Sequence, residues 1–190
     1  NKRHPNSSIV ILEKELDIGR HASGRNSGVM HSGVYYGSKT LKAKVCSLGA
    51  ARMRDFADEY EISYKKVGKV IIASSAEDLP TLDTLLTNAK NNGVKAERLD
   101  VQGVKEIEPY ASAYEAGIYC PDTAVIDSKA IINKLREILE EQGVEFVYGA
   151  PIRTARPNQC LVETAQGKFS YEFLYNCAGA GADLIAKMFG

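Results

Sequence analysis

The stretch SIVILEKE, Ser8–Glu15, joins four consecutive aliphatic residues to a run of charged ones. An aliphatic run of this kind is typical of a strand that is buried on both faces of a parallel sheet. A glycine-rich loop, a helix, an inserted segment, a second helix and further strands follow it along the chain. This order predicts an α/β domain that is interrupted by a smaller one.

The loop GRHASGRNSGVMHSGVYYG, residues 19–37, contains five glycines, two arginines and two histidines. Glycines let backbone N–H groups approach a ligand closely, and arginines donate charge-assisted hydrogen bonds to phosphate. The polar residues that could take part are Arg20, Ser23, Arg25, Asn26 and Ser27. An ordinary flexible surface loop is the alternative, because the glycine spacing matches no known phosphate-binding motif.

Apolar residues at helical spacing predict one helix from Thr40 to Tyr60 and another that begins at Asp127 or Ser128 and ends before Gly143. Between them, short elements alternate without the long apolar runs of a parallel core, which predicts a more antiparallel region. The expected elements of this region are a strand in 67–75, a helix from the cap at 75–78 to Gly93, a strand at 97–100, a helix in 100–109 and a strand in 114–120. After the second long helix, VEFVYG is expected to form a strand, and two further strands are expected to meet at a Gln166–Gly167 turn.

The composition excludes some classes of protein. Lys and Arg total 24 and Asp and Glu also total 24, so no net positive charge favours nucleic acid. The four cysteines have no spacing typical of a zinc site and are interpreted as reduced, mostly buried thiols. No apolar run approaches the roughly 20 residues of a membrane-spanning helix, so a soluble intracellular protein is expected.

Glu13 closes the first strand. In dinucleotide-binding folds, an acidic residue at such a strand end binds a ribose hydroxyl about 20 residues after a G-x-G-x-x-G turn. Counting back that far from Glu13 passes Asn1, so a phosphate-binding turn is expected to precede this chain. Glu13 as a plain surface charge is the alternative.

Several segments together resemble the FAD-dependent L-2-hydroxyglutarate dehydrogenase/oxidase family, within the larger group of flavoproteins similar to D-amino-acid oxidase. The segments are VILEKE, RHASGRNSGVMHSGVYY, LKAKVCSLGA, YKKVGKVIIA, EIEPY, PDTAVIDSKAI and YNCAGAGADLIAKM. The resemblance implies a partial FAD-binding Rossmann-like domain, formed by residues 1–62 and 123–190, and an inserted α+β substrate domain, of which 63–122 are part. It also implies that an amino-terminal G-x-G-x-x-G unit and a carboxy-terminal part lie outside this chain, and that the 190 residues alone bind little FAD and have no turnover.

The resemblance also implies roles for single residues. Glu13 would bind the adenosine ribose, and Ile152 would meet the adenine. The residues that would run past the pyrophosphate, the ribityl chain and the flavin edge are Ser23, Gly24, Arg25, Asn26, Ser27 and Gly28. Ala178 and Gly179 would pack against the cofactor from the last strand.

His31 is the candidate catalytic residue. Oxidation of a 2-hydroxy acid transfers a hydride to the flavin, and the hydroxyl proton needs a base that titrates near the working pH. A histidine that only hydrogen-bonds the loop or the flavin is the alternative. Tyr35 and Tyr36 are candidate contacts for substrate carboxylates, with aromatic packing as the alternative, and Lys66 and Lys69 are further candidates.

The function expected from this resemblance is oxidation of L-2-hydroxyglutarate to 2-oxoglutarate, with oxygen or a quinone as the electron acceptor. Another flavoprotein of the group, acting on an amino acid or on glycerol 3-phosphate, and a non-catalytic FAD-binding subunit are the alternatives. No metal and no nucleic acid is expected as a partner. A cytoplasmic location is expected, and peripheral association of the full-length protein with the inner membrane is left open.

Overall fold

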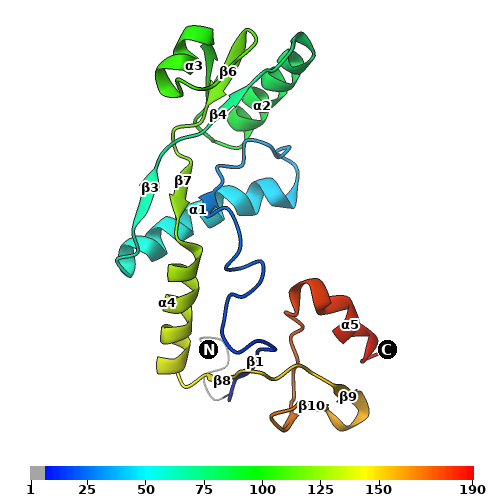
Figure 1. Cartoon of the computed structure of the whole chain (residues 1–190). Coiled ribbons are helices and arrows are strands. Elements are labelled where there is room, and N and C mark those ends of the chain that lie inside the picture. The colour runs from blue at the N-terminus through cyan, green and yellow to red at the C-terminus, as the bar shows by residue number, and fades with distance from the viewer. Residues whose placement is uncertain (1–6) are drawn as a thin grey trace. The chain divides into compact units, whose positions relative to one another are not determined.

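The computed structural model describes residues 7–190, which divide into two compact units. The first unit consists of residues 7–26 and Ser128–Gly190, and the second of Ser27–Asp127. Figure 1 labels the helices and strands of both units. The sequence-based segments 1–62, 63–122 and 123–190 are divided at other positions, and their assignment to cofactor and substrate domains stays a prediction.

The first unit contains a parallel strand pair. β1 (Val10–Leu12) pairs with β8 (Glu145–Val147), and Val10 lies opposite Glu145. The helix α4 (Ser128–Glu141) precedes β8 and buries Ile131. The parallel pairing that SIVILEKE predicts is confirmed, but burial on both faces is wrong, because Val10 is 40% exposed. Only β8 pairs with β1 among the described residues, so little of the strand is covered.

An antiparallel sheet with the order β11-β10-β9 completes the strands of the first unit. Its strands are β9 (Thr154–Arg156), β10 (Leu161–Glu163) and β11 (Lys168–Ser170), with the short helix η2 (Pro157–Gln159) between the first two. The predicted turn is confirmed, since the Thr164 amide donates to the Gly167 carbonyl at 2.9 Å. β11 ends at Ser170, opposite Leu161 at the start of β10, so the expected placement of Ala178 and Gly179 on the last strand is wrong. The short helices η3 (Gly179–Gly181) and α5 (Ala182–Lys187) follow.

In the second unit, β2 (Val29–Met30), β7 (Ala124–Ile126) and β3 (Tyr64–Lys66) form an antiparallel sheet in the order β2-β7-β3. The predicted first long helix is confirmed as α1 (Leu41–Glu59). Thr40 caps it by accepting the Ala43 amide at 3.2 Å. Three of the apolar residues whose helical spacing predicted this helix, Leu41, Val45 and Leu48, are exposed, and the buried side chains are Ala43 and Ala57.

A second antiparallel sheet of this unit has the order β4-β6-β5, which confirms the antiparallel character predicted for this region. Its strands are β4 (Val70–Ile72), β5 (Glu97–Asp100) and β6 (Ala116–Tyr119), and its helices are η1 (Ala76–Asp78), α2 (Leu79–Asn91) and α3 (Val101–Ile107). Figure 1 shows α2 and α3 beside β4 and β6.

The hydrophobic core of the second unit lies between α2 and this sheet. Leu82 and Leu85 of α2 pack with Ile118 of β6, and each is less than a tenth exposed. Fully burying one such side chain contributes about 1.5–3 kcal/mol. Val34, within the glycine-rich loop, is also in this core and is completely buried.

The thiols differ from the expected pattern. Cys120 is buried and Cys46 is half-buried, but Cys160 and Cys177 are exposed, so the interpretation of mostly buried cysteines is wrong. Cys160 lies at the bend before β10, and Cys177 lies in the irregular segment before η3, where no element covers it. None of the helices within residues 7–190 combines the length and the apolar character that crossing a membrane requires.

Candidate functional site

Glu13 lies directly after β1, and its backbone is hydrogen-bonded to the end of β8 and the residues that follow it. Its amide donates to the carbonyl of Val147 at 2.9 Å, and its carbonyl accepts the amide of Ala150 at the same distance. One carboxylate oxygen accepts the amide of Glu15 at 2.9 Å. No other donor to this carboxylate occurs in residues 7–190, so its second oxygen is available to a ligand. The same backbone pairing brings Glu13 next to the segment that leads to Ile152.

After Glu13 the loop folds tightly upon itself. The amides of Gly24 and Arg25 donate to the carbonyl of His21 at 3.1 and 2.9 Å, and the Asn26 side chain donates to the carbonyls of Ala22 and Ser23. A Cβ atom at Gly24 would lie 2.0 Å from the carbonyl oxygen of Gly19. Glycine at position 24 is therefore required by the packing of the loop on its own backbone, whether or not a ligand is bound.

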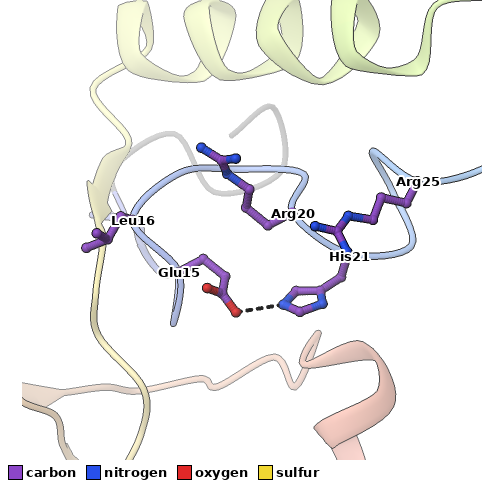
Figure 2. A pocket seen from close by; sticks show the side chains of 5 residues that line it. All are labelled: Glu15, Leu16, Arg20, His21 and Arg25. Carbon is purple, nitrogen blue, oxygen red and sulfur yellow. Dashed lines mark hydrogen bonds and ion pairs between the residues drawn. The ribbon is translucent and has the colours of Figure 1, made fainter.

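This loop borders an open pocket of about 310 Å³, lined by Glu15, Leu16, Arg20, His21 and Arg25. Figure 2 shows the Glu15 carboxylate and the His21 ring facing each other, with the two arginines beside them. The His21 Nε2 atom lies 2.8 Å from the Glu15 Oε1 atom. This hydrogen bond, with the charge of His21, lowers the pKa of Glu15 below its ordinary value.

The two arginines of the pocket differ in their partners. Arg20 lies 3.2 Å from the Asp17 carboxylate, so much of its charge is neutralised. Arg25 is exposed and has no carboxylate within 4.0 Å in the part of the chain that the structure describes. Arg25 therefore presents the guanidinium that is most available to an anionic group of a ligand.

The second unit begins with Ser27 and Gly28. Gly28 has a φ of 65°, and a Cβ atom there would lie 2.5 Å from the carbonyl oxygen of Ile126. The Ile126 amide donates to the Gly28 carbonyl at 2.8 Å, which starts the pairing of β2 with β7. The Ser27 hydroxyl accepts the Val29 amide at 3.4 Å.

The segment from His31 to Tyr36 is tied to two helices and to the core. The Cys46 thiol and the Ser47 hydroxyl of α1 donate to the carbonyls of His31 and Ser32 at 3.3 and 3.4 Å. Val34 anchors the middle of the segment in the core. The backbone is thereby fixed, while the His31 side chain stays exposed.

Asn92, directly after α2, ties down the far part of this segment. Its side-chain amide donates to the carbonyls of Gly33 and Tyr36, at 3.2 and 2.7 Å. Sequence reasoning missed this residue, as well as Cys46 and Ser47. A polar residue at a helix end signals a cap, but not a bond to a segment 56 positions away in the chain.

The two candidate tyrosines have different surroundings. Tyr35 is 49% exposed, and the Lys69 Nζ atom lies 4.2 Å from the centroid of its ring. Tyr36 is half-buried, with the Lys42 Nζ atom 5.8 Å from its ring centroid. The structure thus brings together Tyr35 and Lys69, two residues that the sequence singled out separately.

The remaining candidates lie in the first unit. Ile152 is half-buried, two residues before β9, and Ala178 and Gly179 are exposed at the start of η3. Glu13, Ser23, Gly24, Arg25 and Asn26 belong to this same unit, whereas Ser27, Gly28, His31, Tyr35 and Tyr36 belong to the second. The roles of all these residues remain predictions.

The fold is that of the flavin-dependent oxidoreductases. The L-proline dehydrogenase of P. horikoshii is similar over 100% of this chain and 50% of its own, with a TM-score of 0.86 at 19% sequence identity. The glycine oxidase of Geobacillus kaustophilus is similar over 87% of this chain and 47% of its own, with a TM-score of 0.78 at 18% identity. The model of the FAD dependent oxidoreductase family matches residues 2–190, so the chain belongs to that family, whose cofactor is FAD.

Among curated relatives, the L-2-hydroxyglutarate dehydrogenase of Indibacter alkaliphilus is 36% identical over 98% of this chain and 47% of its own length. The mitochondrial L-2-hydroxyglutarate dehydrogenase of Homo sapiens is 34% identical over 99% of this chain and 44% of its own length. The chain thus spans about half the length of the curated relatives it matches.

Proposed function

We propose that the full-length protein containing this chain oxidises L-2-hydroxyglutarate to 2-oxoglutarate with FAD as its cofactor. The observation that carries the proposal is the identity of 34–36% to two L-2-hydroxyglutarate dehydrogenases along nearly the whole chain. The exposed side chains of His31 and Tyr35 on a fixed backbone segment support it, because they can serve a substrate without reorganising the chain.

Glu13 and Arg25 fit the chemistry of the cofactor. The second carboxylate oxygen of Glu13 suits a ribose hydroxyl, and the exposed guanidinium of Arg25 suits a phosphate. Further proposed contacts come from the loop, from the segment before β9 and from η3, namely Ser23, Gly24, Asn26, Ser27, Gly28, Ile152, Ala178 and Gly179.

Bound FAD supplies the acceptor for the hydride that leaves the carbinol carbon. His31 takes the hydroxyl proton in the same oxidation, so that a carbonyl forms at that carbon and the charge balances. Tyr35 and Tyr36 donate hydrogen bonds to substrate carboxylates. The chemical type of these three side chains, the exposure of His31 and Tyr35, and the fixed backbone of their segment support these roles.

The proposed acceptor of the electrons from the reduced flavin is oxygen or a quinone. The proposed location is the cytoplasm, with peripheral attachment to the inner membrane for electron transfer to a quinone. The balance of 24 basic and 24 acidic residues supports a small-molecule partner over nucleic acid.

The test is an assay of the full-length protein with a dye acceptor and a panel of acids. L-2-hydroxyglutarate should give a kcat/KM well above those of D-lactate, glycine and glycerol 3-phosphate. A rate with L-2-hydroxyglutarate that does not exceed the rates with these compounds would overturn the proposal. A higher rate with glycine or glycerol 3-phosphate would instead assign another activity of the group.

A further inference from the structure

The backbone of Lys69, directly before β4, pairs with the backbone of Cys120, directly after β6. Its amide donates to the carbonyl of Cys120 at 3.1 Å, and its carbonyl accepts the amide of Cys120 at 2.8 Å. The preceding amide, of Gly68, donates to the carbonyl of Thr123 at 2.9 Å. Both Cys120 and Thr123 are buried, so this backbone belongs to the rigid part of the second unit.

Within residues 7–190, the ammonium group of Lys69 has an aromatic partner but no acidic one. Its Nζ atom lies 4.2 Å from the centroid of the Tyr35 ring, in the range of a cation–π contact. No carboxylate oxygen lies within 4.0 Å of it among residues 7–190. Other lysines of the chain do have such partners, as Lys187 does in Asp183 at 3.6 Å.

Lys69 is also partly shielded from solvent. The side chain is half-buried, and its charge acts on the thiols of Cys46 and Cys120. Burial raises the pKa of both thiols, and the positive charge of Lys69 opposes that rise. A cation without a counter-ion in a partly desolvated place binds an anion more strongly than a lysine in open solvent does.

We propose that Lys69, held against the ring of Tyr35, binds the carboxylate of a 2-hydroxy dicarboxylic acid that is remote from the reacting carbon. The inference rests on the proposed oxidation at His31. The carboxylate next to the reacting carbon must share the surroundings of the hydroxyl that His31 deprotonates. Tyr35 lies four residues beyond His31, past the positive-φ turn at Gly33, and has Lys69 beside its ring, so Lys69 offers a cation to the other end of the molecule.

This role makes Lys69 a residue that determines substrate specificity. An acid of equal length without the second carboxylate gains nothing from the ammonium group. Arginine at this position retains the charge and can still stack on Tyr35, whereas methionine keeps the length and removes the charge. Lys65, exposed on β3 and without a carboxylate partner in the described part of the chain, is the matched control.

The experiment uses the full-length FAD-loaded enzyme with Lys69→Met, Lys69→Arg and Lys65→Met. Steady-state kinetics with L-2-hydroxyglutarate are combined with titrations of the unreactive acids glutarate and pentanoate, followed by the change in flavin absorbance. For Lys69→Met we expect KM for L-2-hydroxyglutarate and Kd for glutarate to rise about 10- to 100-fold, the range of a lost hydrogen bond between charged groups. The kcat value and the pentanoate Kd should stay within about 3-fold of wild type.

Lys69→Arg should recover much of the affinity for glutarate, and Lys65→Met should behave as wild type. Unchanged KM and glutarate Kd in Lys69→Met would overturn the inference while leaving the proposed oxidation intact. Equal weakening of glutarate and pentanoate would also overturn it. If the wild type binds glutarate through Lys69 but does not oxidise L-2-hydroxyglutarate, the carboxylate site stands and the proposed function fails.

Discussion

The side-chain amide of Asn92 donates a hydrogen bond of 2.7 Å to the carbonyl of Tyr36, and a second bond of 3.2 Å reaches the carbonyl of Gly33. Asn92 thus connects the end of α2 to the segment that carries the candidate catalytic and substrate-binding side chains. Val34, which lies between Gly33 and Tyr36 in the sequence, is buried in the core. The segment is therefore fixed by the hydrogen bonds of Asn92 and by the packing of Val34.

Asn92→Ala should loosen this segment. Two buried or half-buried carbonyls lose their donor, which we expect to cost about 1–3 kcal/mol of unfolding free energy. Hydrogen exchange of residues 31–36 should accelerate, and KM should rise because the substrate contacts lose their fixed backbone. Asn91→Ala, an exposed neighbour at the end of α2, is the control. Equal exchange rates in the two variants would contradict the tethering role of Asn92.

Gly28→Ala and Gly49→Ala should have opposite effects on stability. A Cβ atom at position 28 meets the Ile126 carbonyl oxygen at 2.5 Å, and the φ of 65° is unfavourable for alanine. We expect a loss of about 2 kcal/mol or more. At Gly49, within α1, a Cβ atom meets nothing within 4 Å, so alanine should stabilise by about 0.5–1 kcal/mol. Thermal unfolding of the two variants measures both values, and a neutral Gly28→Ala would show that β2 and β7 can separate at no cost.

Glu13→Gln should weaken FAD binding. The neutral amide keeps the shape of the side chain but loses the charged acceptor proposed for the ribose hydroxyl, so Kd for FAD should rise about 10- to 100-fold. Glu145→Gln, on the paired strand β8 and exposed, should leave Kd unchanged. Fluorescence titration of the full-length apoprotein with FAD measures both constants. Equal affinities would remove Glu13 from the cofactor site.

The hydrogen bond between Glu15 and His21 should stabilise the folded protein only at pH values at which the Glu15 carboxylate is ionised. The pKa of Glu15 is lowered by the hydrogen bond from His21, so the folded state favours the carboxylate. The contribution is therefore fully present above the ordinary glutamate pKa, about 4.3, and is lost as pH falls through the lowered folded value. Unfolding free energies of wild type and Glu15→Gln should differ near neutral pH and converge in acid, and a difference that grows on acidification would contradict this assignment.

Periodicity and apolar runs predicted several of the strands and helices. IVIL indicated the parallel strand β1, and the helix expected between the cap at 75–78 and Gly93 is α2, which buries Leu82, Leu85 and Ala89. The two-residue strand β2 was not predicted, because two residues are too few to show a period. In α1, apolar residues at helical spacing are exposed. Such spacing therefore indicates a helix but does not show which of its side chains are buried.

The candidate site was predictable as a set of residues but not as a set of contacts. Chemical type and resemblance pointed to His31, Tyr35 and Glu13. The bond from Asn92 and the stacking of Lys69 on Tyr35 depend on tertiary packing between segments far apart in the sequence. Local patterns carry no information about such contacts, so only the folded chain reveals them.

The most direct test of the proposed oxidation is anaerobic mixing of the full-length FAD-loaded protein with L-2-hydroxyglutarate while the absorbance of oxidised flavin is recorded. We expect the absorbance to disappear within the turnover time and 2-oxoglutarate to form in an amount equal to the flavin reduced. His31→Ala should retain its FAD and lose about 10²- to 10⁴-fold in the rate of this reduction. A wild-type flavin that stays oxidised would contradict the proposed oxidation, and a His31→Ala variant that is reduced as fast as wild type would contradict the role of His31 as the base.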